Sequence, residues 1–281
     1  MLTRPHPGAG IVISGVDLRS IDDETFGAIR ELFNKHGLLF FRDQELSEDD
    51  HIALAKRFGT INVNRFFPKS PRPEIALVAK EPTQRSNTGG VWHTDHSYDR
   101  EPALGSILVA RELPPYGGDT WFVNMADAFE RLPTPVRRLL RRKSAVHSSK
   151  HVFGSRGSLL RRLIRNDETV FNPELANAMD DVVHPVVINH PLSGREALYV
   201  NPGFTLRFEH QSTLTSAPLL AYLYWHATRP RHVAKFKWKP GSVAFWDNRA
   251  TWHFAKNDYA GHRRVMHRIT LDGCPVEPSS K

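Results

Sequence analysis

The sequence predicts a mainly β protein, a sandwich or barrel with helices packed on its outside. From residue 75 onward, short runs of β-branched and aromatic residues recur with turn residues between them, which is typical of these architectures. Segments with the apolar period of amphipathic helices stand before and among these runs. Strands therefore dominate the prediction, and helices are expected to flank them.

The first predicted elements are a strand and a helix. Ile11-Val12-Ile13 is a short apolar run, which indicates a strand. Asp22 is a typical residue for the start of a helix, and Gly37 is a typical residue for its end. Between them, four apolar residues share one helical face: Phe26, Ile29, Leu32 and Phe33.

A buried strand and a second helix follow. The run from Leu38 to Phe41 is fully apolar and short, so we expect a strand buried on both faces. Ser47 with Asp50 three residues later resembles a capping box, which starts a helix that ends at Gly59.

The rest of the chain is predicted to be mostly strands. Helices are expected at about 125–142 and about 212–228, the second with an apolar stripe. The stretch 148–180 is the least regular, and it is either a mobile loop over a site or a long surface excursion. The predicted strands are Ile75–Ala79, Ser106–Ala110, Val182–Ile188, Ala197–Val200, Ser242–Trp246 and Arg264–Leu271.

The composition is that of an ordinary globular protein. Of the 281 residues, 40% are hydrophobic and 24% are charged, and no apolar run is long enough to span a membrane. Residues 1–10 have no apolar core, so we expect no secretory signal. Cys274 is the only cysteine, which excludes an internal disulfide and fits a reducing compartment. We therefore expect a cytoplasmic protein.

The net charge of +8 raises the question of a nucleic-acid partner. Basic residues cluster at 137–143 and 161–165, and such clusters attract nucleic acid or anionic metabolites. A solvated helical face is the simpler interpretation. No nucleic-acid-binding motif accompanies the charge, so a nucleic-acid partner is not expected.

A histidine and an aspartate stand two residues apart, at His93 and Asp95. On an extended segment both project to one side, so they can reach one ion while Thr94 points away. Imidazole with carboxylate suits divalent metals such as iron, although most His-x-Asp pairs bind nothing. Any other histidine could be the third ligand. His253 is favoured because the predicted buried strand at 241–246 delivers it at a turn.

Two arginines alternate with a methionine in the run Arg264, Met266, Arg268. On a strand the three share one face, and the two arginine Cα atoms lie about 13 Å apart. The planar fork of arginine binds a carboxylate or sulfonate through two parallel hydrogen bonds. If the two arginines face inward they need anionic partners, whereas outward-facing ones would be ordinary surface residues of an edge strand.

Five segments of the chain resemble the Fe(II)/2-oxoglutarate-dependent dioxygenases of the taurine and 2,4-dichlorophenoxyacetate dioxygenase (TauD/TfdA) family. They stand in the family's order between about residues 10 and 272. The segments are WHTD (92–95), LVARELPPYGGDTWFVN (108–124), HPVV (184–187), ALYVNPGFT (197–205) and WDNRATWHFAKNDYAGHRRVMHR (246–268). The resemblance implies a double-stranded β-helix (jelly-roll, cupin-like) core in a single domain over residues 1–281, with 148–180 as a lid or loop insertion.

The resemblance also assigns the metal and co-substrate residues. It implies that His93, Asp95 and His253 bind Fe(II), with O2 as the oxidant. Arg264 is expected to pair with the distal carboxylate of 2-oxoglutarate, to which Thr120 adds a hydroxyl hydrogen bond. The intact Asp95 argues against a halogenase, because halogenases vacate that position for chloride.

Residues for the primary substrate follow from the same resemblance. Arg268 stands where the taurine enzymes bind the anionic head of the substrate. At three positions the chain departs from them: Asn64 replaces a substrate-binding histidine, Phe67 a tyrosine and Gly89 an asparagine. Taurine is therefore a poor candidate, and a larger, more apolar anion is favoured. Four residues are expected to line the pocket, with simple core packing as the alternative for each: His96, Tyr98, Phe153 and Phe204.

The implied function is hydroxylation of a C–H bond in a small anionic organic substrate, with release of succinate and CO2. Hydroxylation next to oxygen, nitrogen or sulfur would break the bond to that atom. The alternative is desaturation, epimerisation or cyclisation with the same cofactors, which the product mass distinguishes. A third interpretation is an anion- or nucleic-acid-binding protein with an inactive jelly roll, which predicts salt-sensitive DNA binding. Apolar surface on the predicted helix 212–228 could serve a homo-oligomer, dimer or tetramer, or the domain's own sheet.

Overall fold

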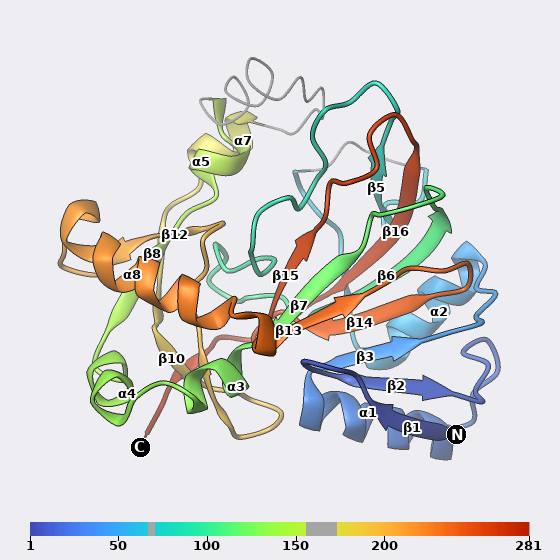
Figure 1. Cartoon of the computed structure of the whole chain (residues 1–281), viewed down its shortest axis with the longest axis horizontal. Coiled ribbons are helices and arrows are strands. Elements are labelled where there is room, and N and C mark those ends of the chain that lie inside the picture. The colour runs from blue at the N-terminus through green and yellow to red at the C-terminus, as the bar shows by residue number, and fades with distance from the viewer. Residues whose placement is uncertain (67–70, 156–172, 281) are drawn as a thin grey trace.

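The computed structural model describes residues 1–66, 71–155 and 173–280, and its largest element is an eight-stranded sheet (Figure 1). The strand order in this large sheet is β1-β2-β3-β14-β6-β16-β4, and β5 pairs with β16 beside it. The sheet therefore joins strands from both ends of the chain. Its strands are β1 (Leu2–Pro5), β2 (Ile11–Ser14), β3 (Leu38–Phe41), β4 (Ile61–Asn62), β5 (Ala76–Lys80), β6 (Gly105–Glu112), β14 (Val243–Asp247) and β16 (Arg264–Leu271).

Three small sheets complete the β-structure of the described residues. The first, which we call the facing sheet, has the order β13-β7-β15 and consists of β7 (Thr120–Asn124), β13 (Val233–Phe236) and β15 (Thr251–Ala255). The second is built from β8 (Ser144–His147), β9 (Val182–Pro185) and β12 (Thr205–Phe208). The third is built from β10 (Val187–Asn189), β11 (Glu196–Leu198) and β17 (Glu277–Pro278).

The large sheet is buried on both faces, as the apolar run of β3 predicts. Leu39 and Phe41 pack on the side of the helices α1 (Asp23–His36) and α2 (Glu48–Phe58). Leu38 and Phe40 point the other way, because successive residues of a strand alternate. They join an inner core shared with the facing sheet: Val12, Leu108, Phe122, Ala234, Phe236, Trp246 and Met266. This packing of two sheets is the expected jelly-roll arrangement.

The ends of the first two helices are confirmed. The side chain of Asp22 accepts a hydrogen bond from the Thr25 backbone N–H at 2.7 Å. Gly37 ends α1 in the left-handed conformation, with φ of 64°, which glycine adopts without strain. Ser47 and Asp50 form the complete capping box that opens α2.

Two predicted elements are each broken in two. The strand predicted at 182–188 is divided between β9 and β10, because the chain leaves one small sheet for another just after Pro185, which has no backbone N–H to donate. The helix predicted at 125–142 is α3 (Met125–Glu130) followed by α4 (Thr134–Leu140). Pro133 separates them, since the residue before a proline is disfavoured in helical conformation.

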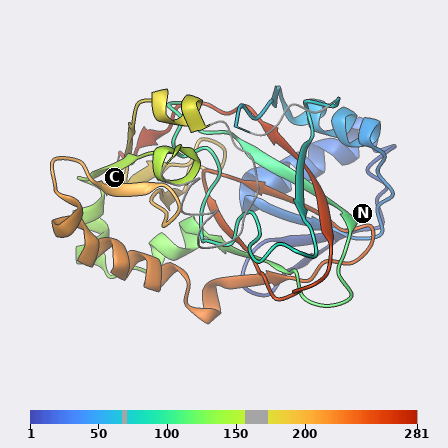
Figure 2. The ribbon, with the colours of Figure 1, turned by 90° about the horizontal axis from the view of Figure 1, so that it is seen from above.

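The remaining helices lie on the opposite side of the molecule from α1 and α2 (Figures 1 and 2). The predicted helix at 212–228 is confirmed as α8 (Thr213–Ala227), and it packs with α3 around the small sheets. In the irregular stretch 148–180, the structure describes α5 (Lys150–Phe153) and α7 (Pro173–Ala178). The central part of that stretch, 156–172, lies outside the described residues, and so does the expectation of a mobile loop there.

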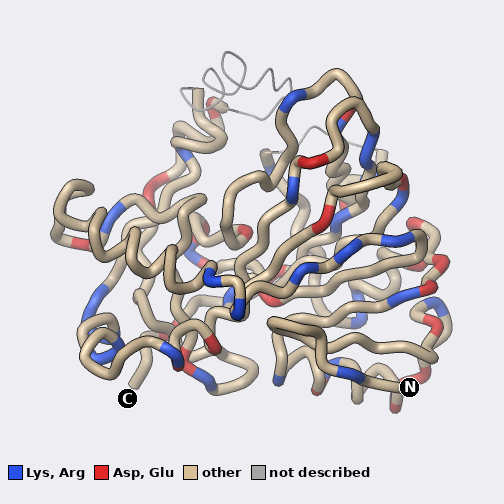
Figure 3. The backbone as a smooth tube through the Cα atoms, in the orientation of Figure 1, with Lys and Arg blue, Asp and Glu red and all other residues tan. Residues whose placement is uncertain are grey.

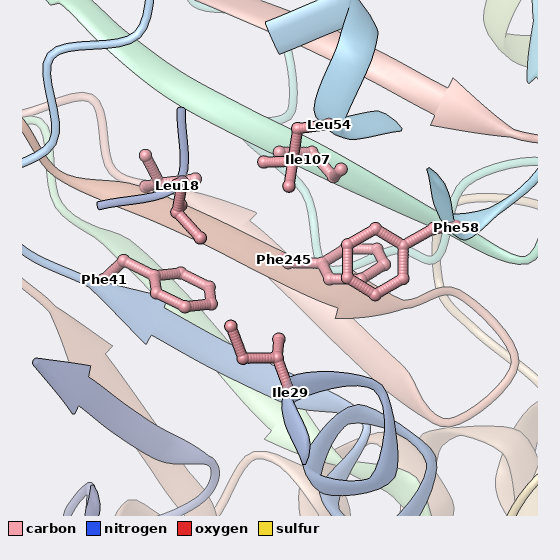
Figure 4. A pocket seen from close by; sticks show the side chains of 8 residues that line it. Leu18, Ile29, Phe41, Leu54, Phe58, Ile107 and Phe245 are labelled. Atoms are coloured by element: carbon pink, nitrogen blue, oxygen red, sulfur yellow. The ribbon is translucent and has the colours of Figure 1, made fainter. Parts of the chain in front are cut away.

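A small void lies in the core between α1, α2 and the large sheet (Figure 4). Its strand residues face α1 and α2, as Phe41, Ile107 and Phe245 do, on the side of the sheet away from the inner core. The whole lining is apolar: Leu18, Ile29, Phe41, Leu54, Phe58, Ile107, Val243 and Phe245. The void offers no polar group that could bind an anion or a metal.

In the described part of the chain, lysines and arginines are spread along the tube and are interspersed with acidic residues (Figure 3). Arg141, from the basic run after residue 136, makes a two-pronged ion pair with Glu196 at 2.6 and 2.7 Å. Among the described residues, no helix has the length and the apolar character that crossing a membrane requires.

Candidate metal and anion site

Strand alternation directs polar residues of both sheets into the space between them. Arg264 and Arg268 lie on the same face of β16 as Met266, which belongs to the inner core. On the facing sheet, His253 is the register partner of Phe122, another inner-core residue. Both arginines are buried, with 4% and 8% exposure, so the surface interpretation of this strand is wrong.

His93, Asp95 and His253 converge although some 160 positions separate the first from the last. His93 and His253 form an isolated antiparallel bridge, with backbone hydrogen bonds of 3.1 and 2.8 Å in the two directions. One ligand atom from each of the three residues lies within 4.8 Å of the other two. His253 belongs to β15 and not to a turn, which corrects the prediction of how it is delivered.

A side-chain hydrogen bond orients one of these three groups, the His93 imidazole. The Nδ1 of His93 lies 2.7 Å from the Val91 carbonyl oxygen, which can only accept, so Nδ1 carries the hydrogen. The lone pair is then on Nε2, which faces Asp95 Oδ1 at 3.6 Å. Thr94 points away from the site, and its hydroxyl donates to the Asn248 carbonyl oxygen.

Electrostatics favour the metal-binding protonation states. Burial lowers the pKa of His253 well below its ordinary value, so the imidazole is neutral. Burial by itself would raise the pKa of Asp95, but the Arg268 guanidinium and both histidines hold it well below the usual range. The site therefore offers two imidazoles and one carboxylate, which is a donor set suited to Fe(II).

Two glycines pack against His93. A Cβ added to Gly203 would meet the Cβ of His93 at 2.6 Å, so only glycine fits there. A Cβ on Gly89 would lie 3.4 Å from Cε1 of the same ring. Gly203 is not predictable from the sequence, because its constraint comes from a contact across the fold.

The co-substrate residues predicted from the sequence are brought together. Arg264 Nη2 lies 3.5 Å from the Thr120 hydroxyl, which also accepts a 2.9 Å hydrogen bond from the Trp238 indole. Since an indole N–H can only donate, Thr120 is left to donate its own hydrogen elsewhere. Arg264 Nε is buried and has no hydrogen-bond partner among the described residues. These donors can receive a carboxylate.

Arg268 connects the anion site to the metal ligands, since its Nη1 lies 3.0 Å from Asp95 Oδ2. Tyr98 is close enough for the charges of Asp95 and Arg268 to act on its hydroxyl, whose pKa burial raises. A ligand held by Arg268 would therefore lie beside the three predicted metal ligands.

Aromatic rings form one wall next to His93. The ring of Phe204 lies 6.2 Å from that of His93 and 4.7 Å from that of Tyr98. Phe153, from α5, stacks on Phe66 at 4.7 Å. Phe66 was not predicted from the sequence. The predicted residue is its neighbour Phe67, which lies outside the described residues.

Two further predicted residues have local roles. His96 is buried with a positive φ of 60°, and its Nδ1 donates to Asp99 at 2.8 Å. Such a backbone conformation is uncommon for histidine and is often found near functional sites. The Asn64 amide oxygen accepts a 2.9 Å hydrogen bond from the Phe66 backbone, so it shapes the turn that presents the Phe66 ring.

Comparisons with known proteins agree with this geometry. The family model of the taurine catabolism dioxygenase TauD, TfdA family matches residues 2–270. The chain is 34% identical over 275 residues to the alpha-ketoglutarate-dependent sulfate ester dioxygenase of Pseudomonas putida, covering 95% of this chain and 89% of that protein. It is 32% identical over 268 residues to the alkylsulfatase of Acinetobacter baylyi, covering 94% and 82%. The crystal structure of a taurine dioxygenase from Burkholderia xenovorans superposes with a TM-score of 0.78 and 32% identity, covering 97% of this chain and 90% of that one.

Proposed function

The chain belongs to the taurine catabolism dioxygenase TauD, TfdA family, and on that basis we propose that His93, Asp95 and His253 hold its iron. The protein is a dioxygenase that uses Fe(II), 2-oxoglutarate and O2 and acts on a small anionic organic substrate. The convergence of three ligand atoms within 4.8 Å is the observation that carries the proposal. Bound Fe(II) supplies the activation of dioxygen, which is coupled to the conversion of 2-oxoglutarate to succinate and CO2.

The residues present fit such an ion. The three donors are two imidazole nitrogens and a carboxylate oxygen, the set that in non-haem iron oxygenases binds Fe(II) and leaves coordination positions open. The carbonyl of Val91 holds the His93 ring with Nε2 toward the carboxylate. The open positions would take the co-substrate and dioxygen.

Arg264 and Thr120 are proposed to bind the distal carboxylate of 2-oxoglutarate. Two observations support this proposal. Both residues lie between the two sheets, and the Arg264 Nε and the Thr120 hydroxyl each have a hydrogen left to donate. Burying a guanidinium is costly; the charge of Asp119 offsets part of this cost for Arg264, and an incoming carboxylate would offset more of it. Trp238 fixes the direction of the Thr120 hydroxyl by donating to its oxygen.

For the primary substrate we propose an organic sulfate ester with an apolar body. Arg268 would bind the sulfate, and the rings of Tyr98, Phe153 and Phe204 would contact the hydrocarbon. The 3.0 Å contact between Arg268 and Asp95 means that a head group held there keeps its first carbon near the metal ligands. Two relatives with similar sequences are named for sulfate esters, which also favours this class.

Positioning of this kind selects the bond that is oxidised. Hydroxylation of the carbon that bears the ester oxygen gives a product that collapses to an aldehyde and inorganic sulfate. The protein's contribution is to hold that carbon in place and to keep water away with the aromatic wall.

The test is a substrate screen scored by coupled succinate formation. We expect alkyl sulfates to be turned over faster than taurine, with release of inorganic sulfate and an aldehyde. Succinate formation should require Fe(II) and 2-oxoglutarate and should be lost in Asp95→Ala, but not in the control His210→Ala, whose side chain is exposed. Turnover that survives Asp95→Ala would reject the proposed iron ligands. A preference for taurine would reject only the substrate class.

We also propose that residues 1–281 form one domain and that it works in the cytoplasm. The large sheet supports a single unit, because β3 from the N-terminal part pairs with β14 from the C-terminal part. Cys274, the only cysteine, is free, as the reducing cytoplasm requires.

A homodimer through α8 is proposed for the quaternary structure. The helix contains no Asp, Glu, Lys or Arg, and it exposes a stripe of Leu214, Pro218, Ala221 and Trp225. An apolar stripe can pair with its own copy about a two-fold axis, and the Arg229 guanidinium, 4.3 Å from the centre of the Trp225 ring, would lie at the edge of that interface. Light scattering should show a dimer that Trp225→Glu dissociates; a monomeric native protein would reject this interface.

A further inference from the structure

Lys80 is a buried lysine beside the proposed co-substrate site. It is the last residue of β5, with 3% exposure, and its register partner on β16 is Arg264. Directly opposed residues of antiparallel strands project to the same side of the sheet. Two buried cationic residues are therefore neighbours in the strand register at this end of the site.

Neither cation forms an ion pair with any carboxylate in the described part of the chain. The Lys80 ammonium donates to Asn257 Oδ1 at 2.7 Å and lies 4.4 Å from the centre of the Tyr259 ring. The Arg264 guanidinium has the Thr120 hydroxyl at 3.5 Å and the Trp238 ring at 5.9 Å. Opposed like charges are destabilising, and burial increases the cost. An anion bound between them would remove it.

The contacts of Lys80 also hold the loop between β15 and β16. Tyr259 is 1% exposed, and Arg264 is close enough to act on its hydroxyl. The Asn257 amide donates to the Arg85 carbonyl oxygen at 2.8 Å. Asn87 donates to the carbonyl oxygen of Lys256 at 3.1 Å, on the same loop. Lys80 thus lies at the junction of β5, this loop and Arg264.

We propose that Lys80 is a positioning residue for the co-substrate and the second cationic determinant of its distal carboxylate. It holds Tyr259 beside Arg264 and adds positive potential at the end of the pocket where the carboxylate binds. The site therefore selects 2-oxo dicarboxylic acids over 2-oxo monocarboxylic acids. This inference rests on the proposed function, because it takes the site of Arg264 as the co-substrate site.

The experiment measures anaerobic binding of two acids to the Mn(II)-loaded full chain by calorimetry. One is 2-oxoglutarate; the other is 2-oxopentanoate, which has the same chain length and no distal carboxylate. Lys80→Met should weaken 2-oxoglutarate binding about tenfold, or about 1.4 kcal/mol, and change 2-oxopentanoate binding less than about twofold. Lys80→Arg should restore most of the affinity. The control Lys35→Met removes an exposed lysine of α1 and should change neither value.

The outcomes separate the inference from the function on which it rests. Equal weakening of both acids, or unchanged binding of 2-oxoglutarate in Lys80→Met, would overturn the role of Lys80 and leave the proposed function standing. Failure of the native protein to bind 2-oxoglutarate would overturn both. Circular dichroism and the Mn(II) affinity of each variant show whether the fold and the metal site are intact.

Discussion

The substitution Gly203→Ala tests how closely the fold controls the position of a proposed metal ligand. The added Cβ would lie 2.6 Å from the His93 Cβ, and ordinary contact begins at 3.4 Å, so about 0.8 Å of movement is required. His93 cannot move freely, because its backbone pairs with His253 and its ring donates to Val91. A metal site tolerates ligand shifts of only about 0.2 Å.

Overpacking of this size costs about 1–3 kcal/mol, and the strain is relieved when His93 leaves its ligating position. We therefore expect metal binding to weaken by about 5- to 150-fold. Mn(II) binding, followed by electron paramagnetic resonance of the free ion, measures this directly. The control is Gly27→Ala in α1, where a Cβ would meet nothing within 4 Å and alanine favours the helix. A Gly203→Ala protein with Mn(II) affinity within twofold of the native value would refute the reasoning.

Three further predictions concern stability and the substrate. Burial, followed by the charge of Arg111, lowers the pKa of His51 to about 3, against 6.5 in the unfolded chain. Protonation of His51 therefore does not affect the free energy of unfolding above about pH 6.5. As the pH falls toward 3, the unfolded chain takes up a proton that the folded chain does not, and the free energy of unfolding falls by up to about 5 kcal/mol. Urea unfolding of His51→Leu should show a correspondingly weaker loss at low pH, and an unchanged pH dependence would contradict this. Arg268→Lys, which loses the two-pronged hydrogen bond, should raise the KM of the anionic substrate at least about tenfold and leave 2-oxoglutarate affinity unchanged; an unchanged KM would place the head group elsewhere. Phe204→Leu should shift the preferred alkyl chain length in the substrate screen, and an identical chain-length profile would exclude Phe204 from the pocket wall.

Local signals predicted the N-terminal part of the fold well. The caps at Asp22 and Ser47 act within one helical turn, and the apolar run of β3 depends only on its own residues. Both kinds of signal are readable without tertiary context. The strands β7 and β15 were missed, because each is five residues long and their pairing with one another fixes them more than their own propensity does.

The residues of the site also fall into two groups: those predicted from local sequence patterns and those that depend on contacts in the folded chain. Alternation predicted that Arg264 and Arg268 share a face, but not whether that face is inward; the packing of Met266 against the facing sheet decides it. Spacing suggested His93 with Asp95, whereas the addition of His253 depends on a backbone bridge between distant segments. Gly203 and Lys80 could not be found from the sequence, since both act through contacts made only in the folded chain.

The count of divalent ions bound per chain tests the central claim most directly. Equilibrium dialysis of the purified protein against Mn(II), followed by metal analysis, should give one tightly bound ion for the native chain. Asp95→Ala and His253→Ala should each bind none at the same concentration, while both remain folded by circular dichroism. Full occupancy in either variant would mean that the ion is held elsewhere and would contradict the proposed iron site.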